Sequence, residues 1–180
     1  MTVTTTSLRT VGALTAGLLA LGMLAACTPE PEPTPTKTAL FASDEEAFAA
    51  AEETYRAYTD AVNEVDLSNP DSFEQVYSWL TGTALAPEKE ALSLYHAEGL
   101  TKTGTSTFDS YTPLSRSAEE VVAQLCLDSS ALDLIRANGE SALPSDRAPR
   151  QGRKVTFVPA DTATGLRIAS SHKPEEDFQC

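Results

Sequence analysis

The sequence predicts an α+β domain in which three N-terminal helices pack on an antiparallel sheet. Two observations support this. In residues 43–99 apolar side chains recur every three or four positions, as they do in amphipathic helices. After Gly99 the apolar residues tend to alternate, and threonine and aromatic residues become frequent, as in strands. Because the helices and the strands occupy separate halves of the chain, an α+β arrangement is favoured over alternating βαβ units.

The first helix is expected to begin after Ser43 and to end near Asp66. Ser43 and Glu46, three positions later, form a capping box, which satisfies free backbone N–H groups at a helix start. An apolar stripe then faces one side. It consists of Phe48, Ala51, Tyr55, Tyr58, Val62 and Val65.

Two more helices are expected before Gly99. Asn69 and Pro70 are both favoured at a helix start, so the second helix is predicted from there to Gly82. The third is predicted at about 87–98, with Gly99 as its C-terminal stop. The inward-facing residues are Phe73, Val76, Tyr77 and Leu80 in the second helix and Ala91, Leu92, Tyr95 and His96 in the third.

Five strands are expected in the second half of the chain. They are predicted at 104–115, 119–128, 132–137, 155–158 and 166–168. In the second strand, Val121, Ala123, Leu125 and Leu127 alternate toward one side and Cys126 points to the other. Asn138-Gly139 is a strong turn signal, and a long polar loop is expected at 140–152.

Residues 1–26 have the pattern of a signal peptide. Residues 1–10 are polar and contain one basic residue, Arg9, and no acid. An apolar run, VGALTAGLLALGML, follows at 11–24 and is too short to span a bilayer as a helix. The segment is therefore predicted to direct export.

The apolar run ends in Leu24-Ala25-Ala26-Cys27, which resembles the lipobox of bacterial lipoproteins. In that family an aliphatic residue and two small residues precede a cysteine. The resemblance implies that the thiol of Cys27 carries a diacylglyceryl group and that cleavage makes Cys27 the first residue of the mature chain. The lipid would then hold the protein at the extracytoplasmic face of the cell membrane. The alternative is an ordinary signal peptide followed by a chance cysteine.

Beyond the predicted cleavage site the chain divides into a stalk and one domain. Prolines at 29, 31, 33 and 35 favour an extended stalk over residues 27–42, and residues 43–180 suit a single α+β domain. Removing residues 1–26 takes away one arginine and no acid, which leaves 12 basic and 26 acidic residues. Because such a surface repels phosphate backbones, the sequence argues against nucleic-acid binding.

The predicted domain contains two cysteines, Cys126 and Cys180. An even number of cysteines in an exported protein is typical of a disulfide. The alternatives are two buried free thiols or a metal site, and neither His96 nor His172 stands at ligand spacing from a cysteine. A bridge closing a loop of about 54 residues is expected to stabilise the fold by about 4 kcal/mol. No metal and no cofactor are expected.

The order of elements resembles the NTF2-like fold, in which a curved antiparallel sheet wraps around a long N-terminal helix. The similarity to small secreted actinobacterial lipoproteins of this type rests on Cys126-x-Asp128-x-Ser130, Asn138-Gly139, Arg147 and Val155-Thr156-Phe157. The long loop at 140–152 departs from the usual pattern. The resemblance implies a cone that often encloses a pocket, with isomerase, dehydratase or cyclase activity in some relatives.

A pocket of this kind would need polar groups whose pKa values shift in a dry cavity. The candidate pocket residues are Tyr55, Tyr58, Trp79, Tyr95, His96 and Tyr111. Aromatic residues at helical spacing also fill cores, so packing is their alternative role. Asp109 and Asp128 are the acids in the predicted strands that are placed to face a cavity. The sequence contains no recognised catalytic motif, so no catalytic residue is assigned.

The sequence favours a membrane-anchored, surface-exposed lipoprotein that acts as a non-catalytic interaction or accessory module with an envelope protein or polymer as partner. The alternative is a small-molecule-binding pocket protein or, behind it, an isomerase- or dehydratase-type enzyme. If the protein is an interaction module, its interior is expected to be filled by side chains. If it is a pocket protein, an open cavity lined by tyrosines is expected. A basic cluster, Arg147, Arg150, Arg153 and Lys154, is interpreted either as a polymer-binding site or as a soluble loop.

If Cys27 is the lipid attachment site, Cys27→Ala removes the thiol that accepts the lipid. The variant is then expected to stay unprocessed and to lose incorporation of a fatty-acid probe. Labelling of wild type and variant in the same cells measures this. Equal labelling of the two proteins would refute the anchoring prediction.

Overall fold

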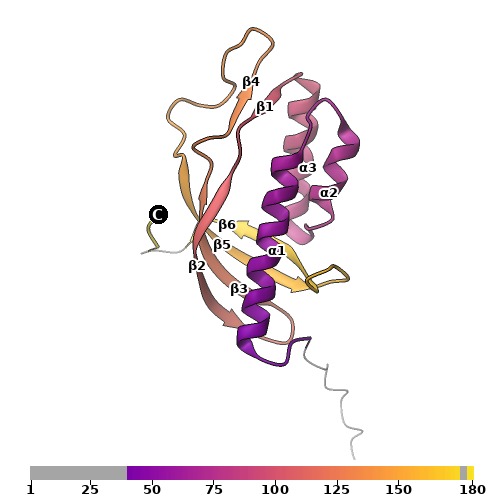
Figure 1. Cartoon of the computed structure of the whole chain (residues 1–180), viewed down its shortest axis with the longest axis vertical. Helices are drawn as coiled ribbons and strands as arrows, with labels where there is room; N and C mark the ends of the chain where they lie inside the picture. The colour runs from indigo at the N-terminus through magenta and orange to yellow at the C-terminus, as the bar shows by residue number, and fades with distance from the viewer. Residues whose placement is uncertain (1–39, 175–177) are drawn as a thin grey trace, which may run out of the picture. The chain divides into compact units, whose positions relative to one another are not determined.

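The structure is a computed structural model that describes residues 40–174 and 178–180. The predicted signal peptide, Cys27 and the stalk up to residue 39 lie outside these residues. Within them the α+β prediction is confirmed, because three α-helices pack on a curved antiparallel sheet (Figure 1). None of the helices in this part of the chain has the length and apolar character needed to cross a membrane.

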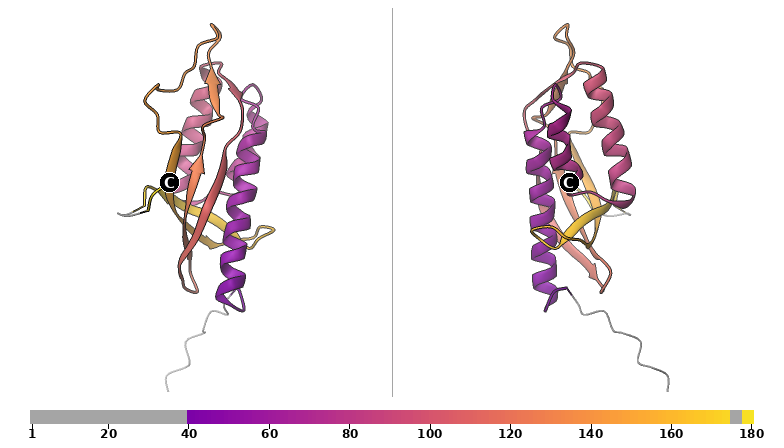
Figure 2. Two further views of the ribbon diagram at one scale, coloured as in Figure 1. Left: turned by 60° about the vertical axis from the view of Figure 1, so that its left-hand side comes forward. Right: turned by 90° about the vertical axis from the view of Figure 1, so that its right-hand side faces the viewer.

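The first helix, α1 (Asp44–Glu64), forms where the sequence predicts it and ends two residues earlier. The Ser43 hydroxyl accepts a hydrogen bond from the Glu46 backbone N–H at 3.1 Å. The Glu46 carboxylate accepts one from the Ala42 backbone N–H at 2.8 Å. The helix lies across the sheet and buries its apolar stripe there (Figures 1 and 2).

The second and third helices differ from their predicted bounds. The 3-10 helix η1 (Pro70–Ser72) starts at the predicted Asn69 cap and leads into α2 (Phe73–Tyr77), which ends five residues before Gly82. The third helix, α3 (Gly82–Ala97), begins five residues earlier than expected. Gly82 therefore starts a helix instead of ending one.

The short link between α2 and α3 explains this difference. The Thr81 backbone N–H donates to the Ile168 carbonyl, and the Ile168 N–H donates to the Trp79 carbonyl, each at 2.9 Å. Residues 79–81 are thereby fixed against a strand. Gly82 follows with φ +53°, and a Cβ there would lie 2.8 Å from the Ala169 carbonyl oxygen. Only glycine satisfies both the backbone angle and the close approach.

The main sheet has four antiparallel strands in the order β2-β3-β5-β6. Their bounds are β2 (Thr107–Arg116), β3 (Val121–Asp128), β5 (Arg150–Pro159) and β6 (Leu166–His172). Two short strands, β1 (Thr101–Thr103) and β4 (Asp133–Ile135), pair with each other in a separate sheet. The long N-terminal helix against a curved sheet agrees with the arrangement that the NTF2-like resemblance implies (Figure 1).

The predicted loop at 140–152 is too long, because β5 begins at Arg150. Residues 150–154 pair with residues 124–128 of β3 in an unbroken register, including Arg153 opposite Leu125. The sequence pattern did not predict residues 150–154 as strand, because they contain no apolar side chains that alternate. The backbone pairing extends the strand by five residues beyond the apolar segment at 155–158.

The hydrophobic core lies between the helices and the inner face of the sheet. In β3, Val121, Ala123 and Leu125 are buried on that face, as the alternation predicted. From β5 and β6, Val155, Phe157, Leu166 and Ile168 join the buried α1 and α2 side chains. This core holds α1, α3 and the sheet in fixed relation.

The C-terminal residues lie on the outer face of the sheet. Cys180 is disulfide-bonded to Cys126 of β3, with their Cα atoms 5.6 Å apart. A Cβ on Gly152 would approach Pro174 Cγ and Phe178 Cδ1 at 3.0 and 3.1 Å. The last part of the chain therefore packs directly on β5 and is attached covalently to β3.

Cys180→Ser is expected to lower the free energy of unfolding by about 4 kcal/mol, because the bridge restricts a long loop in the unfolded chain. Denaturant unfolding of variant and wild type measures the difference. As a control, reductant should bring the wild type to the midpoint of the variant and leave the variant unchanged. Free thiols at both Cys126 and Cys180 in the unreduced protein would contradict the bridge.

Candidate functional site: a cavity between the helices and the sheet

An open cavity of about 380 Å³ lies between α1, α3 and the inner face of the sheet. This volume falls within the range of small-molecule pockets. Its walls come from Tyr55, Tyr58, Thr59 and Val62 of α1, Thr83, Ala84, Pro87 and Glu88 of α3, Leu127, Arg153, Ile168 and Ser171 of the sheet, and Leu80 and Ser106. The interior next to the core is thus not completely filled by side chains.

Tyr55 forms a rigid, apolar part of the cavity wall. It lies on the inward stripe of α1, four residues from Thr59 and three from Tyr58. Its ring packs edge-on against Phe108, with centroids 4.9 Å apart, and against Tyr58 at 5.8 Å. Burial raises the pKa of Tyr55 to about 12, so the phenol stays protonated under physiological conditions.

Glu88 and Tyr58 form a polar pair on the helical walls of the cavity. The Tyr58 hydroxyl and the Glu88 carboxylate lie close enough to shift each other's pKa, and both side chains are partly buried. Burial raises the pKa of Glu88, and the contact with the Tyr58 hydroxyl opposes part of that rise. Burial, reinforced by the nearby Glu88 charge, also raises the pKa of Tyr58.

Arg153 reaches the cavity from the opposite wall, on β5. Its neighbours two and four positions on, Val155 and Phe157, are completely buried on the same face of the strand. The guanidinium donates a hydrogen bond to Gln151 Oε1 at 3.0 Å. Burial raises the pKa of Tyr55, and the positive charge of Arg153 opposes part of that rise.

Sequence reasoning missed both Glu88 and Arg153. Glu88 lies four residues before the buried Leu92, which places it on the inward stripe of α3. Arg153 alternates with Val155 along β5, which places it on the inner face. The predicted helix at about 87–98 contained the Glu88–Leu92 spacing, but only apolar and aromatic residues were considered for its inward face. Arg153 was missed because the strand was predicted to start at 155.

Of the six candidate pocket residues, only Tyr55 and Tyr58 line the cavity. Trp79 and Tyr95 pack against the core as partly buried side chains. His96 places Nδ1 2.7 Å from the Leu67 carbonyl oxygen. The Tyr111 hydroxyl donates to the Phe48 carbonyl at 3.0 Å. These four residues have packing or backbone-bridging roles, which was the alternative drawn from their spacing.

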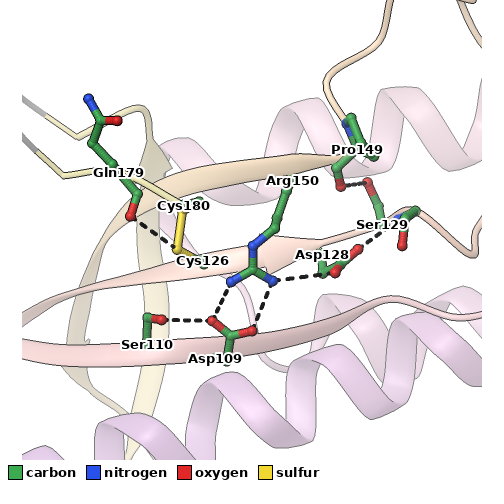
Figure 3. Close-up of polar contacts among 10 residues, drawn as sticks. Asp109, Ser110, Cys126, Asp128, Ser129, Pro149, Arg150, Gln179 and Cys180 are labelled. Carbon is green, nitrogen blue, oxygen red and sulfur yellow. Dashed lines mark hydrogen bonds and ion pairs between the residues drawn. A yellow bond between two sulfur atoms is a disulfide. The ribbon is translucent and has the colours of Figure 1, made fainter.

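Asp109 and Asp128 do not face the cavity. Both lie on the outer face of the sheet and bind Arg150, as Figure 3 shows. The contacts are 2.6 Å to Asp109 Oδ1 and 3.3 Å to Asp128 Oδ2. The hydrogen bond from Arg150 lowers the pKa of Asp109. Because side chains alternate along a strand, Arg150 and Arg153 lie on opposite faces of β5.

The basic cluster is also dispersed by the fold. Arg147 donates to the Ser129 and Leu132 carbonyls at 3.0 and 3.1 Å and so fixes the loop before β5. With Arg150 paired on the outer face and Arg153 in the cavity, the cluster forms no single anion-binding surface. In residues 40–174 and 178–180 no group of three His, Cys, Asp or Glu side chains is placed to hold a metal ion.

No protein-family model matches the sequence, and no curated protein is significantly similar to it. Solved structures resemble the chain over most of their length. They include a proposed aromatic-ring-hydroxylating dioxygenase beta subunit from Novosphingobium aromaticivorans, at 10% identity over 75% of this chain and 92% of that one, with a TM-score of 0.47. A Catenulispora acidiphila protein in complex with S-DNPA is 13% identical over 69% and 90% of the chains, with a TM-score of 0.46. The Aln2 protein from a Streptomyces species is 16% identical over 72% and 89%, with a TM-score of 0.43. Similarity at this level assigns no function to the chain.

The raised pKa of Glu88 predicts a pH-dependent loss of stability. The folded state keeps the Glu88 proton at pH values where the unfolded chain has lost it, so ionisation opposes folding. Stability from this group is therefore present below the ordinary carboxyl pKa of about 4.3 and is lost as the pH rises through the raised value.

Glu88→Gln is accordingly expected to raise the melting temperature by a few degrees at about pH 7 and to have little effect at about pH 4. Thermal unfolding at the two pH values measures this. Glu90→Gln, at an exposed position of the same helix, makes the same charge change and is the control. Equal pH profiles for the two variants would contradict the prediction.

Proposed function

We propose that this protein binds a small molecule in the cavity between α1, α3 and the sheet. The observation that carries the proposal is the open volume of about 380 Å³, whose walls combine apolar surface with polar and charged side chains. Glu88 and Arg153 are the charged groups, and hydroxyl groups come from Tyr58, Thr59, Thr83, Ser106 and Ser171. Apolar walls would supply most of the affinity, and the polar groups would orient the ligand.

The cavity supports the pocket alternative over the interaction module. A module that acts only through its outer surface gains nothing from an open interior, because empty space forfeits packing contacts and destabilises the fold. Here the space borders completely buried core residues such as Ile168. Leaving this volume open is understandable if a ligand occupies it in the working protein.

The proposed location of the pocket is the extracytoplasmic face of the membrane. Support comes from the apolar run at 11–24, the LAAC sequence that ends at Cys27 and the proline-containing stalk. Two acyl chains on Cys27 would give firm anchoring. The ligand would then be met outside the membrane, by a domain held on a short tether.

We propose binding without turnover. A second candidate, proton transfer of the isomerase or dehydratase type, has one observation in its favour. A carboxyl group with a raised pKa beside a phenol is a common acid–base arrangement. Burial of the two side chains, however, accounts for their raised pKa values without any substrate, and binding needs no proton transfer. This supports a structural and orienting role for the pair.

Filling the cavity should abolish binding of an apolar probe. N-phenylnaphthylamine is a neutral molecule whose fluorescence rises in apolar sites, and titration into the purified protein is expected to give a saturable signal. Ala84→Trp places an indole on the cavity wall and should remove that signal, because the ring occupies the open volume.

Ala86→Trp is the matched control, since Ala86 is exposed on the same helix and does not line the cavity. It should bind the probe as the wild type does. Thermal unfolding checks that both variants fold. Equal binding by folded Ala84→Trp and Ala86→Trp proteins would show that the probe does not use the cavity, and no saturable binding by the wild type would refute the proposal.

A further inference from the structure

We propose that the cavity is built for a small organic acid, in which an apolar body carries a single anionic group that Arg153 binds. This inference rests on the proposed binding function and goes beyond it by naming the chemical class of the ligand. Its evidence is the position of Arg153, the partner that it has in the structure and the character of the walls around it.

Arg153 occupies a position where an apolar residue is expected. It pairs with Leu125 in the β3–β5 register and lies on the same face as the completely buried Val155 and Phe157. The side chain is partly buried, and the hydration that its guanidinium loses there is costly unless charged or polar partners replace the water. The arginine therefore needs an explanation that packing does not give.

The partner that Arg153 has is neutral. Its hydrogen bond goes to the amide oxygen of Gln151 at 3.0 Å, and no ion pair to it is found in the described residues. By contrast Arg56, Arg116 and Arg150 contact carboxylates at 2.9, 2.7 and 2.6 Å. The full chain has 26 acidic residues against 13 basic ones, so carboxylates are plentiful.

The guanidinium thus retains donors that point to an anion from outside the chain. Arginine carries five N–H donors in a planar fork that fits a carboxylate or a similar oxyanion in bidentate fashion. One of these donors is used by Gln151. In a cavity that partly excludes water, the remaining donors would bind an anion more strongly than they would at an exposed surface.

The other walls define the rest of the ligand. Val62, Leu127 and Ile168 line the cavity and offer apolar surface to a hydrocarbon or aromatic body. Glu88 lies beside Tyr58 on the helical side and is not ion-paired with Arg153 in the described structure. A multiply charged anion would be repelled by Glu88 once ionised and by the net charge of −13. A monoanion with an apolar body fits both observations.

The test compares two fluorescent probes that share one aromatic body. N-phenylnaphthylamine is neutral, and anilinonaphthalene sulfonate carries one sulfonate on the same framework. Arg153→Gln is expected to weaken binding of the sulfonate about tenfold or more relative to binding of the neutral probe, the loss typical of a charge-assisted hydrogen bond.

Lys154→Gln is the matched control, because it removes the same charge from the next residue of β5, on the opposite face. It should change neither affinity. A second measurement needs no variant: octanoate should displace the neutral probe from the wild type at much lower concentration than octanol does. Preference for octanol, or equal effects of Arg153→Gln and Lys154→Gln on the sulfonate, would overturn the proposed ligand class.

The outcomes separate this inference from the function on which it rests. If the neutral probe binds and Ala84→Trp blocks it, the cavity is a binding site whatever the result with the sulfonate. If the neutral probe does not bind at all, the proposed function fails and the ligand class fails with it. Thermal unfolding of Arg153→Gln shows whether this variant folds.

Discussion

The pairing of β3 with β5 is the constraint on which the rest of the structure depends. Its register runs unbroken from Val121 opposite Phe157 to Asp128 opposite Arg150. Because side chains alternate across a strand, this register decides which residues meet the helices and which meet the C-terminal residues. A slip by one residue would bury Lys154 and turn Arg153 outward.

That register gives two neighbouring arginines different roles. Arg150 bridges Asp109 and Asp128 on the outer face, so it joins β2, β3 and β5, while Arg153 faces the cavity beside a neutral amide. Exposed ion pairs like those of Arg150 contribute modestly to stability. Arg153 says more about function, because none of the described carboxylates pairs with its charge in the cavity.

The cavity itself depends on long-range packing between α3 and β6. The close approach of Gly82 to Ala169 and the backbone bonds of residues 79–81 to Ile168 set the start and direction of α3. Ala84 and Glu88 follow on its inward side. The first turn of α3 is thereby held against β6. The cavity between α3 and α1 stays open because Ala84 is small, and a larger residue there would fill it.

The sequence by itself determined the α+β class, the first helix with its Ser43 cap, the alternation in β3 and the cysteine pair, because these follow from local periodicity, local capping and composition. It also identified Tyr55 and Tyr58 on the inward stripe. Only the tertiary structure decided that Gly82 begins α3, that β5 begins at Arg150 and that Glu88 and Arg153 share a cavity. These features arise from contacts between segments far apart in the chain, and local sequence patterns do not reveal such contacts.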